Sequence, residues 1–238
     1  MTAAFVILLT AFGPFPGIPV NATALLVPRL AQRLRRLAAA RSPLLPDAAI
    51  SVHTTTLPTE WQRGPDRAEA TIGRLRPDLV LHFGVSSQAS GFVIERVGRS
   101  ACQPHPDAAG HLAPSPTLGP AATHNATLPV DAICDRLSAN GLPVSASTDA
   151  GGYLCNAVLY RTLSLPTGVR PPIAGFIHIP AALAGPVKLR ARTSPETARP
   201  VVPSALTHSD FLTGAVHIAA TCLAALAAER KIPHYDRA

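Results

Sequence analysis

The sequence predicts an α/β protein, a three-layer sandwich with a mostly parallel central sheet and helices on both faces. Short apolar segments alternate along the chain with longer segments of helical periodicity. The first and last of these apolar segments carry almost no polar residues, which is typical of strands covered by helices on both faces of a parallel sheet. Because the 238 residues show no compositional break, we expect a single domain over residues 1–238.

The first predicted strand, FVILLT, is apolar along its length and ends in a loop of glycine and proline. A later segment, LVLHFG, ends on glycine, and the segment IAGFIHI is closed by Pro180. Five strands are predicted in all, over residues 5–10, 50–57, 79–84, 144–148 and 173–179.

The first predicted helix follows Asn21 and Thr23, and either side chain can cap it. The third has proline at its start and Gly141 after its end, the usual asymmetry of helix termini. The helices are predicted over about 21–40, 66–75, 129–140, 152–163 and 209–228. Two Pro-rich segments, 98–128 and 185–207, stay unassigned, and loops of this length are usually functional lids or mobile segments.

Composition argues against several classes of protein. The apolar N-terminal stretch lacks a basic region before it, is too short to span a bilayer and breaks at Gly13-Pro14, so we predict no membrane association. The four cysteines are far apart and form no CxxC pair, which argues against a zinc site and a disulfide scaffold. We therefore expect a cytoplasmic protein without a metal or other cofactor.

The net charge of +7 comes mostly from arginine and could favour anionic partners. The main local cluster lies on the polar side of the first predicted helix and has no aromatic residues between its members, which favours a solvated helix face over a nucleic-acid footprint. Its members are Arg29, Arg33, Arg35, Arg36 and Arg41. We predict no nucleic-acid partner.

Ligands of open α/β sheets collect at the carboxyl ends of the strands, and one of the residues placed there is a cysteine. Cys155 falls in the first turn of a predicted helix that follows a strand and a Gly-Gly turn. Free N–H groups and the helix dipole at such a position favour a thiolate, which makes Cys155 a candidate nucleophile. Any one cysteine is more often a core residue, and that interpretation is kept for Cys102, Cys134 and Cys222.

Two further residues could complete a catalytic set with this thiol. His178 lies in the apolar strand GFIHIP, where a lone histidine is usually a core residue, but a nearby thiol would make it a candidate base. Glu95 lies in FVIERV, where a buried acid needs a partner. It could form a salt bridge with Arg96 or another arginine, or it could orient His178, and spacing alone favours neither.

Five segments together resemble the pyroglutamyl-peptidase I family, cysteine peptidases that remove N-terminal pyroglutamate. They are LLTAFGPFPGIPVN, the Glu-Arg-Val of FVIERV, GPAATHNATLPVDAI, DAGGYLCN and GFIHIP. They occur in family order from about residue 5 to residue 180, and the final helix also fits. The resemblance implies peptides with N-terminal pyroglutamate as substrates and a possible homo-oligomer.

The resemblance also implies roles for residues. The family's Cys, His and Glu triad falls on Cys155, His178 and Glu95. The aromatic side chains that sandwich the lactam ring fall on Phe12, Phe15 and Tyr153. Without the resemblance, the two phenylalanines would be interpreted as loop anchors that pack on the core.

The chain departs from the family pattern in several places. Ala11 replaces a usual glycine, Asn21-Ala22-Thr23 replaces Asn-Pro-Ser, Ala89 stands where an arginine is common, and Ser100 replaces an asparagine. These changes bear on efficiency and substrate range more than on fold. They motivate an alternative hypothesis, a non-catalytic or repurposed relative that binds peptides or a protein partner, although the intact Cys, His and Glu argue against it. Phosphate or nucleotide binding at FGPFPG is poorly supported because the chain has no GxGxxG pattern.

Overall fold

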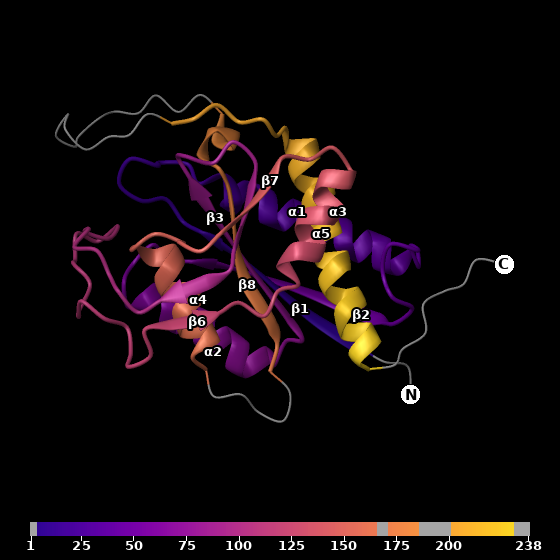
Figure 1. Ribbon diagram of the computed structural model, residues 1–238, viewed down its shortest axis with the longest axis horizontal. Helices are drawn as coiled ribbons and strands as arrows, with labels where there is room; N and C mark the ends of the chain where they lie inside the picture. Colours follow the sequence, from indigo (N-terminus) through magenta and orange to yellow (C-terminus); the bar gives the residue numbers. More distant parts are fainter. Residues whose placement is uncertain (1–3, 166–170, 186–200, 231–238) are drawn as a thin grey trace.

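A six-stranded sheet in the order β2-β1-β3-β8-β4-β7 forms the centre of the protein (Figure 1). The computed structural model describes residues 4–165, 171–185 and 201–230. The strands of this sheet are β1 (Ala4–Phe12), β2 (Ala49–Leu57), β3 (Leu79–Ser86), β4 (Phe92–Glu95), β7 (Val144–Ser147) and β8 (Ile173–Pro180). Strands β2, β1, β3 and β8 are parallel, whereas β4 is antiparallel to β8 and carries β7 parallel to itself. The predicted, mostly parallel sheet is confirmed.

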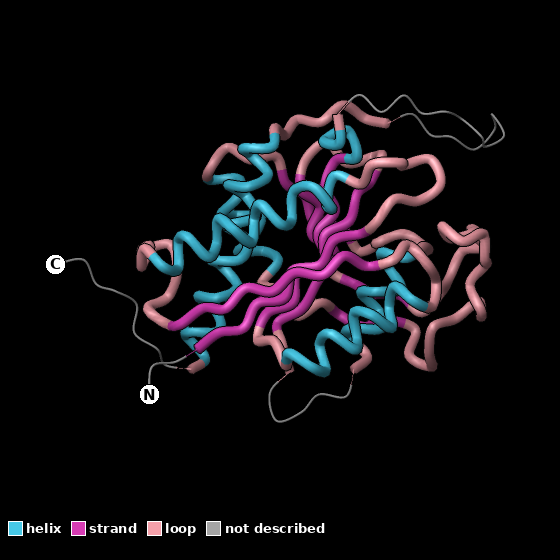
Figure 2. The backbone as a smooth tube through the Cα atoms, turned by 180° about the vertical axis from the view of Figure 1, so that it is seen from behind, coloured by secondary structure: helices cyan, strands magenta, loops and turns pink. Residues whose placement is uncertain are grey.

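Helices cover both faces of the sheet, as predicted (Figure 2). One layer contains α1 (Ala22–Ala39), α3 (Val130–Ala139) and α5 (His208–Glu229), and the other contains α2 (Arg63–Leu75) and α4 (Leu154–Leu163). Side chains of β1 enter both cores, because Ile7 and Leu9 pack toward α1 and α5 while Leu8 packs toward α2. This alternation explains why the first strand is apolar at successive positions.

Local sequence signals set where two of the helices begin. The Asn21 side chain accepts a hydrogen bond from the Thr23 backbone N–H (3.1 Å), so Asn21 is the cap of α1. A capping box between Thr207 and Asp210 starts α5. Four of the five clustered arginines lie on α1 and Arg41 follows its end; all five are exposed, which agrees with a solvated surface.

Helix α5 is the one helix among the described residues that is long and apolar enough to cross a membrane. In this structure 61% of its most apolar 18-residue window is buried, and it packs beside α1 and α3 in the larger core. Its composition is thus the one expected of a core helix.

The sequence did not predict three strands and a short helix. The sequence pattern does not indicate β4, and it leaves residues 98–128 without a predicted element, whereas in the structure β5 (Val97–Arg99) and β6 (Thr123–Asn125) pair there as a small second sheet. A 3₁₀ turn, Ala181–Ala184, follows β8. Of the other unassigned segment, residues 186–200 lie outside the described residues, and residues 201–205 run along the loop after β3 through backbone hydrogen bonds to Ser87 and Ser90.

Candidate active site

The candidate site lies where β1, β3 and β8 end at the carboxyl edge of the sheet. Gly84 of β3 stands beside His178 of β8 in the parallel register, and α4 begins at Leu154, so Cys155 is its second residue. Tyr153, the residue before α4, makes no side-chain cap, which leaves first-turn N–H groups available to an anion. The predicted position of the thiol is therefore confirmed.

Cys155, His178 and Glu95 line one open cleft of about 780 Å³. His178 Nδ1 lies 2.8 Å from Glu95 Oε1, within a hydrogen bond that is buried. Because Nδ1 faces the carboxylate, Nε2 is the ring nitrogen left to face the sulfur. Of the two roles open to Glu95, the geometry favours orientation of His178, since Arg96 pairs instead with Asp131.

The Cys155 thiol and the Glu95 carboxylate both raise the pKa of the His178 imidazole. Burial by itself lowers the pKa of His178, but the charge of Cys155 and hydrogen bonds to Cys155 and Glu95 outweigh it and raise this pKa to about 10. A protonated imidazole beside a sulfur anion is the charge pair that a cysteine nucleophile requires.

Glu95 is an unusual buried acid, only 1% exposed. Its Oε2 atom has no hydrogen-bond partner among the residues that the structure describes. Ala89, which stands where the family commonly has an arginine, is buried and lines the same cleft. The carboxylate is therefore compensated mainly by His178.

Gly84 permits the close approach of the nucleophile to the strand. A Cβ atom at this position would lie 2.6 Å from the Phe176 ring and 3.0 Å from the Cys155 sulfur, both too close for a normal contact. The glycine that ends the predicted third strand is thus required by packing beneath the thiol.

Phe12, Phe15 and Tyr153 come together beside Cys155 in a narrow cavity of about 20 Å³, which we call the aromatic slot. The rings of Phe15 and Tyr153 lie 6.3 Å apart, and the buried Phe12 packs on Phe176. The slot opens into the larger cleft, because both are lined by Phe15, Tyr153 and Cys155. All six residues that the sequence singled out therefore lie at one site.

Some residues of the site were missed in the sequence. Asn156 is fully buried, accepts from Arg99 N (2.8 Å) and donates to Arg99 O (2.7 Å), so it joins the nucleophile helix to β5. A polar residue inside the apolar run of α4 was the available signal. Thr59 lines the aromatic slot and Trp61 contacts Tyr153, and the sequence around these two residues carries no such signal.

Other titratable groups do not share this arrangement. His82 lies in the core between Thr10 (2.8 Å) and Thr162 (3.0 Å), and burial lowers its pKa to about 3, so it is neutral. Burial raises the pKa of the Cys222 thiol, which is sealed in α5. No group of three His, Cys, Asp or Glu suited to a metal ion occurs within the described part of the chain.

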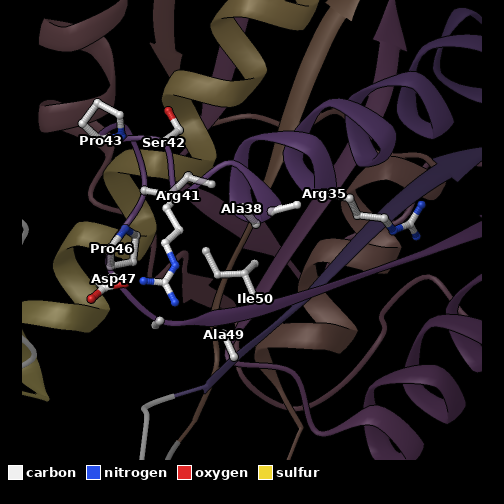
Figure 3. Close-up of a pocket in the computed structure, with 12 residues that line it drawn as sticks. Arg35, Ala38, Arg41, Ser42, Pro43, Pro46, Asp47, Ala49 and Ile50 are labelled. Carbon is white, nitrogen blue, oxygen red and sulfur yellow. The ribbon is translucent and has the colours of Figure 1, made fainter.

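A separate cavity of about 670 Å³ lies between the end of α1 and the start of β2 (Figure 3). Its polar lining residues are Arg35, Arg41, Ser42 and Asp47, and the others are apolar. In Figure 3 the Arg35 side chain extends away from the other lining residues. It shares no lining residue with the aromatic slot or the larger cleft, and it holds no thiol or imidazole.

Comparison with known proteins gives a consistent result. Residues 5–203 match the family model described as pyroglutamyl peptidase. The chain is 32% identical to the pyrrolidone-carboxylate peptidase of Pyrococcus furiosus over 73% of its length and 80% of the relative's. It is 33% identical to the one from Gloeobacter violaceus, covering 81% of this chain and 89% of that protein.

Solved structures agree with this. Pyroglutamyl peptidase I of Bacillus amyloliquefaciens superimposes with a TM-score of 0.72 at 25% identity, covering 92% of this chain and 97% of that one. A mutant pyrrolidone carboxyl peptidase from Pyrococcus furiosus gives 0.72 at 26% identity, covering 93% and 99%. The chain therefore belongs to the pyroglutamyl peptidase family.

Proposed function

We propose that this protein is a cysteine peptidase that hydrolyses the peptide bond after an N-terminal pyroglutamyl residue. The observation that carries the proposal is the buried contact of His178 with Glu95 beside a cysteine at the start of a helix, next to an aromatic slot. Relatives named pyrrolidone-carboxylate peptidase support the same substrate.

The reaction begins when the Cys155 thiolate attacks the acyl carbon of the pyroglutamyl residue. A C–S bond forms and the carbonyl electrons move to oxygen, where N–H groups at the start of α4 stabilise the oxyanion. When the oxyanion collapses, the C–N bond breaks and the leaving amine takes the proton of His178 Nε2. A thioester remains on Cys155.

Water completes the cycle. Neutral His178 takes a proton from a water molecule, which attacks the thioester carbon, and the C–S bond breaks to release pyroglutamate and restore the thiolate with its imidazolium. Glu95 holds Nδ1 through its 2.8 Å hydrogen bond throughout, so that Nε2 keeps facing the sulfur.

Specificity follows from the charge of the substrate. A pyroglutamyl residue has no α-ammonium group, so it can bind beside Phe15 and Tyr153, where the aromatic slot opens into the larger cleft, without the loss of ionic hydration. A free amino terminus in the same place would lose several kcal/mol of hydration. Peptides with free amino-terminal glutamine should therefore be poor substrates.

The test is hydrolysis of pyroglutamyl-7-amino-4-methylcoumarin by the recombinant protein. Cys155→Ser should abolish it, whereas Cys102→Ser, a partly buried thiol outside the cleft, should retain it. Activity that survives Cys155→Ser would refute the assignment of the nucleophile. Equal rates on pyroglutamyl and free glutaminyl substrates would refute the proposed specificity.

A further inference from the structure

Residues 103–111, part of the segment that the sequence left unassigned, connect the two sides of the aromatic slot. We propose that Asp107, around which this segment turns, is a positioning residue that fixes Tyr153 and so sets the affinity for pyroglutamyl substrates. The inference rests on the proposed function of the slot, and it concerns a residue outside the catalytic set.

Asp107 is an acid that the fold has enclosed, with 2% of its surface exposed. Its Oδ1 accepts hydrogen bonds from the backbone N–H groups of Ala109 and His111, both 2.9 Å, and its Oδ2 accepts one from Trp61 (3.0 Å). Burial opposes the charged form, but these three donors outweigh it and hold the pKa of Asp107 below its usual range. The carboxylate therefore remains ionised and ties its own loop to the segment before α2.

The loop holds one side of the slot through residues 59–61. Ala108 N donates to Thr59 O (2.9 Å), and Trp61 Nε1 donates to His105 O (2.9 Å). Thr59 itself lines the slot, and its hydroxyl donates to Gly13 O (3.1 Å) in the loop that carries Phe12 and Phe15. Movement of the Asp107 loop would consequently move this wall.

The loop holds the opposite side through residues 152–153. Gln103 N donates to Gly152 O (2.8 Å), and the Tyr153 hydroxyl donates to Pro106 O (3.1 Å). The Trp61 indole and the Tyr153 ring also make a T-shaped contact, with centroids 5.2 Å apart and planes at 89°. Tyr153 is therefore fixed at its ring by Trp61 and at its hydroxyl by Pro106.

The hydroxyl of Tyr153 stays a donor over the working pH range. Burial, followed by the charges of Asp107 and Cys155, raises its pKa to about 12. None of the hydrogen bonds described for residues 103–111 involves the side chain of Cys155, His178 or Glu95. The loop should thus influence binding in the slot far more than the chemistry at the sulfur.

Asp107→Asn tests the proposal because it keeps the volume but replaces an accepting oxygen with an amide that cannot accept from a backbone N–H. We expect KM for the pyroglutamyl coumarin amide to rise about tenfold while kcat changes less than about twofold. Tyr153→Phe, which removes only the bond to Pro106 O, should raise KM by roughly threefold. Asp210→Asn is the matched control, since it removes a hydrogen-bonded carboxylate of the α5 capping box and should leave KM unchanged.

Binding can be measured without turnover. In a Cys155→Ala background, calorimetry with pyroglutamyl-alanine should show a dissociation constant about tenfold higher when Asp107→Asn is added. Trp61 is the only tryptophan in the chain, so release of the loop should also shift the emission of the free protein to longer wavelength. These measurements do not depend on the catalytic assignment of Cys155.

Two results would overturn the inference. One is an Asp107→Asn variant whose KM and dissociation constant stay within twofold of their parents. The other is a variant whose kcat and rate of Cys155 alkylation fall together with KM unchanged, which would mark a structural role. If Asp107→Asn does not fold, an unchanged KM in Tyr153→Phe overturns the inference. Failure of the proposed function would appear differently, as a wild-type protein that binds pyroglutamyl-alanine without hydrolysing the coumarin amide.

Discussion

Glu95→Gln is the sharpest test of the catalytic arrangement, because it removes a charge without changing shape. The 2.8 Å contact between Glu95 Oε1 and His178 Nδ1 is buried, and Glu95 is one of the groups that raise the pKa of His178. A hydrogen bond to a charged group contributes about 1.5–3 kcal/mol, and about 1.4 kcal/mol is a factor of ten. The substitution should therefore lower kcat/KM roughly 10- to 100-fold.

The assay combines initial rates on the pyroglutamyl coumarin amide with alkylation of Cys155 by iodoacetamide at neutral pH. Both rates should fall, while KM changes little because Glu95 does not line the aromatic slot. Glu60→Gln is the control, since Glu60 forms a surface ion pair with Arg63 (3.1 Å) whose contribution is at most about 1 kcal/mol. Wild-type kcat/KM in a folded Glu95→Gln variant would refute the role of Glu95.

Four further outcomes are expected. The pKa of His178 is raised to about 10 in the folded protein. Protonated His178 therefore stabilises the fold fully at a pH below the ordinary histidine pKa, and this stabilisation is lost as the pH rises through about 10. Cys155→Ala removes a charge that raises this pKa, so between about pH 7 and about pH 10 its urea midpoint should fall less steeply than that of the wild-type protein. Equal slopes in the two proteins would contradict the coupling between Cys155 and His178. Gly84→Ala should destabilise the fold by about 1–3 kcal/mol and abolish activity, because its Cβ would meet the sulfur at 3.0 Å. Gly73→Ala, on the exposed face of α2, adds a Cβ that meets no atom within 4 Å beyond the adjoining backbone of its own helix, so it should instead stabilise the protein by about 0.5–1 kcal/mol in a denaturant titration. Thiol titration of the native protein should show a rapid phase that Cys155→Ser removes, and the fully buried Cys222 should react only after unfolding.

Most of the central sheet could be predicted because its strands carry their own signal. Segments such as FVILLT are apolar at successive positions, and each needs cover on both faces wherever it is placed. Strand β4 lacked that signal, since FVIE has four residues and includes an acid. It is a strand because β8 and β7 pair with it on either side, and that pairing is a property of the tertiary structure.

The residues of the site also fall into those that sequence patterns can locate and those that depend on tertiary contacts. Cys155 lies just after a helix start and His178 lies close to the end of a strand, and sequence patterns can locate both features. The role of Glu95 was undecided because its partner lies 83 residues away along the chain. Asp107 and Trp61 were not recognised because their function consists of a hydrogen bond across 46 residues, and no local periodicity records such a contact.

The reversed direction of β4 explains how the Glu95 carboxylate is buried away from water. Because β4 runs opposite to β8, Val93 stands beside His178, and Glu95 lies two residues further from the carboxyl edge, opposite Phe176. The acid therefore reaches the imidazole from beneath, where water does not compete for its hydrogen bond and the interaction is strengthened. Because Oε2 has no hydrogen-bond partner within the described residues, His178, which is bonded to Oε1, is the main group that compensates the buried carboxylate. Removing one partner of a buried pair costs about 3–5 kcal/mol, so His178→Ala should destabilise the fold far more than Cys155→Ala. Equal unfolding free energies for the two variants would show that Glu95 is not held as a buried charge.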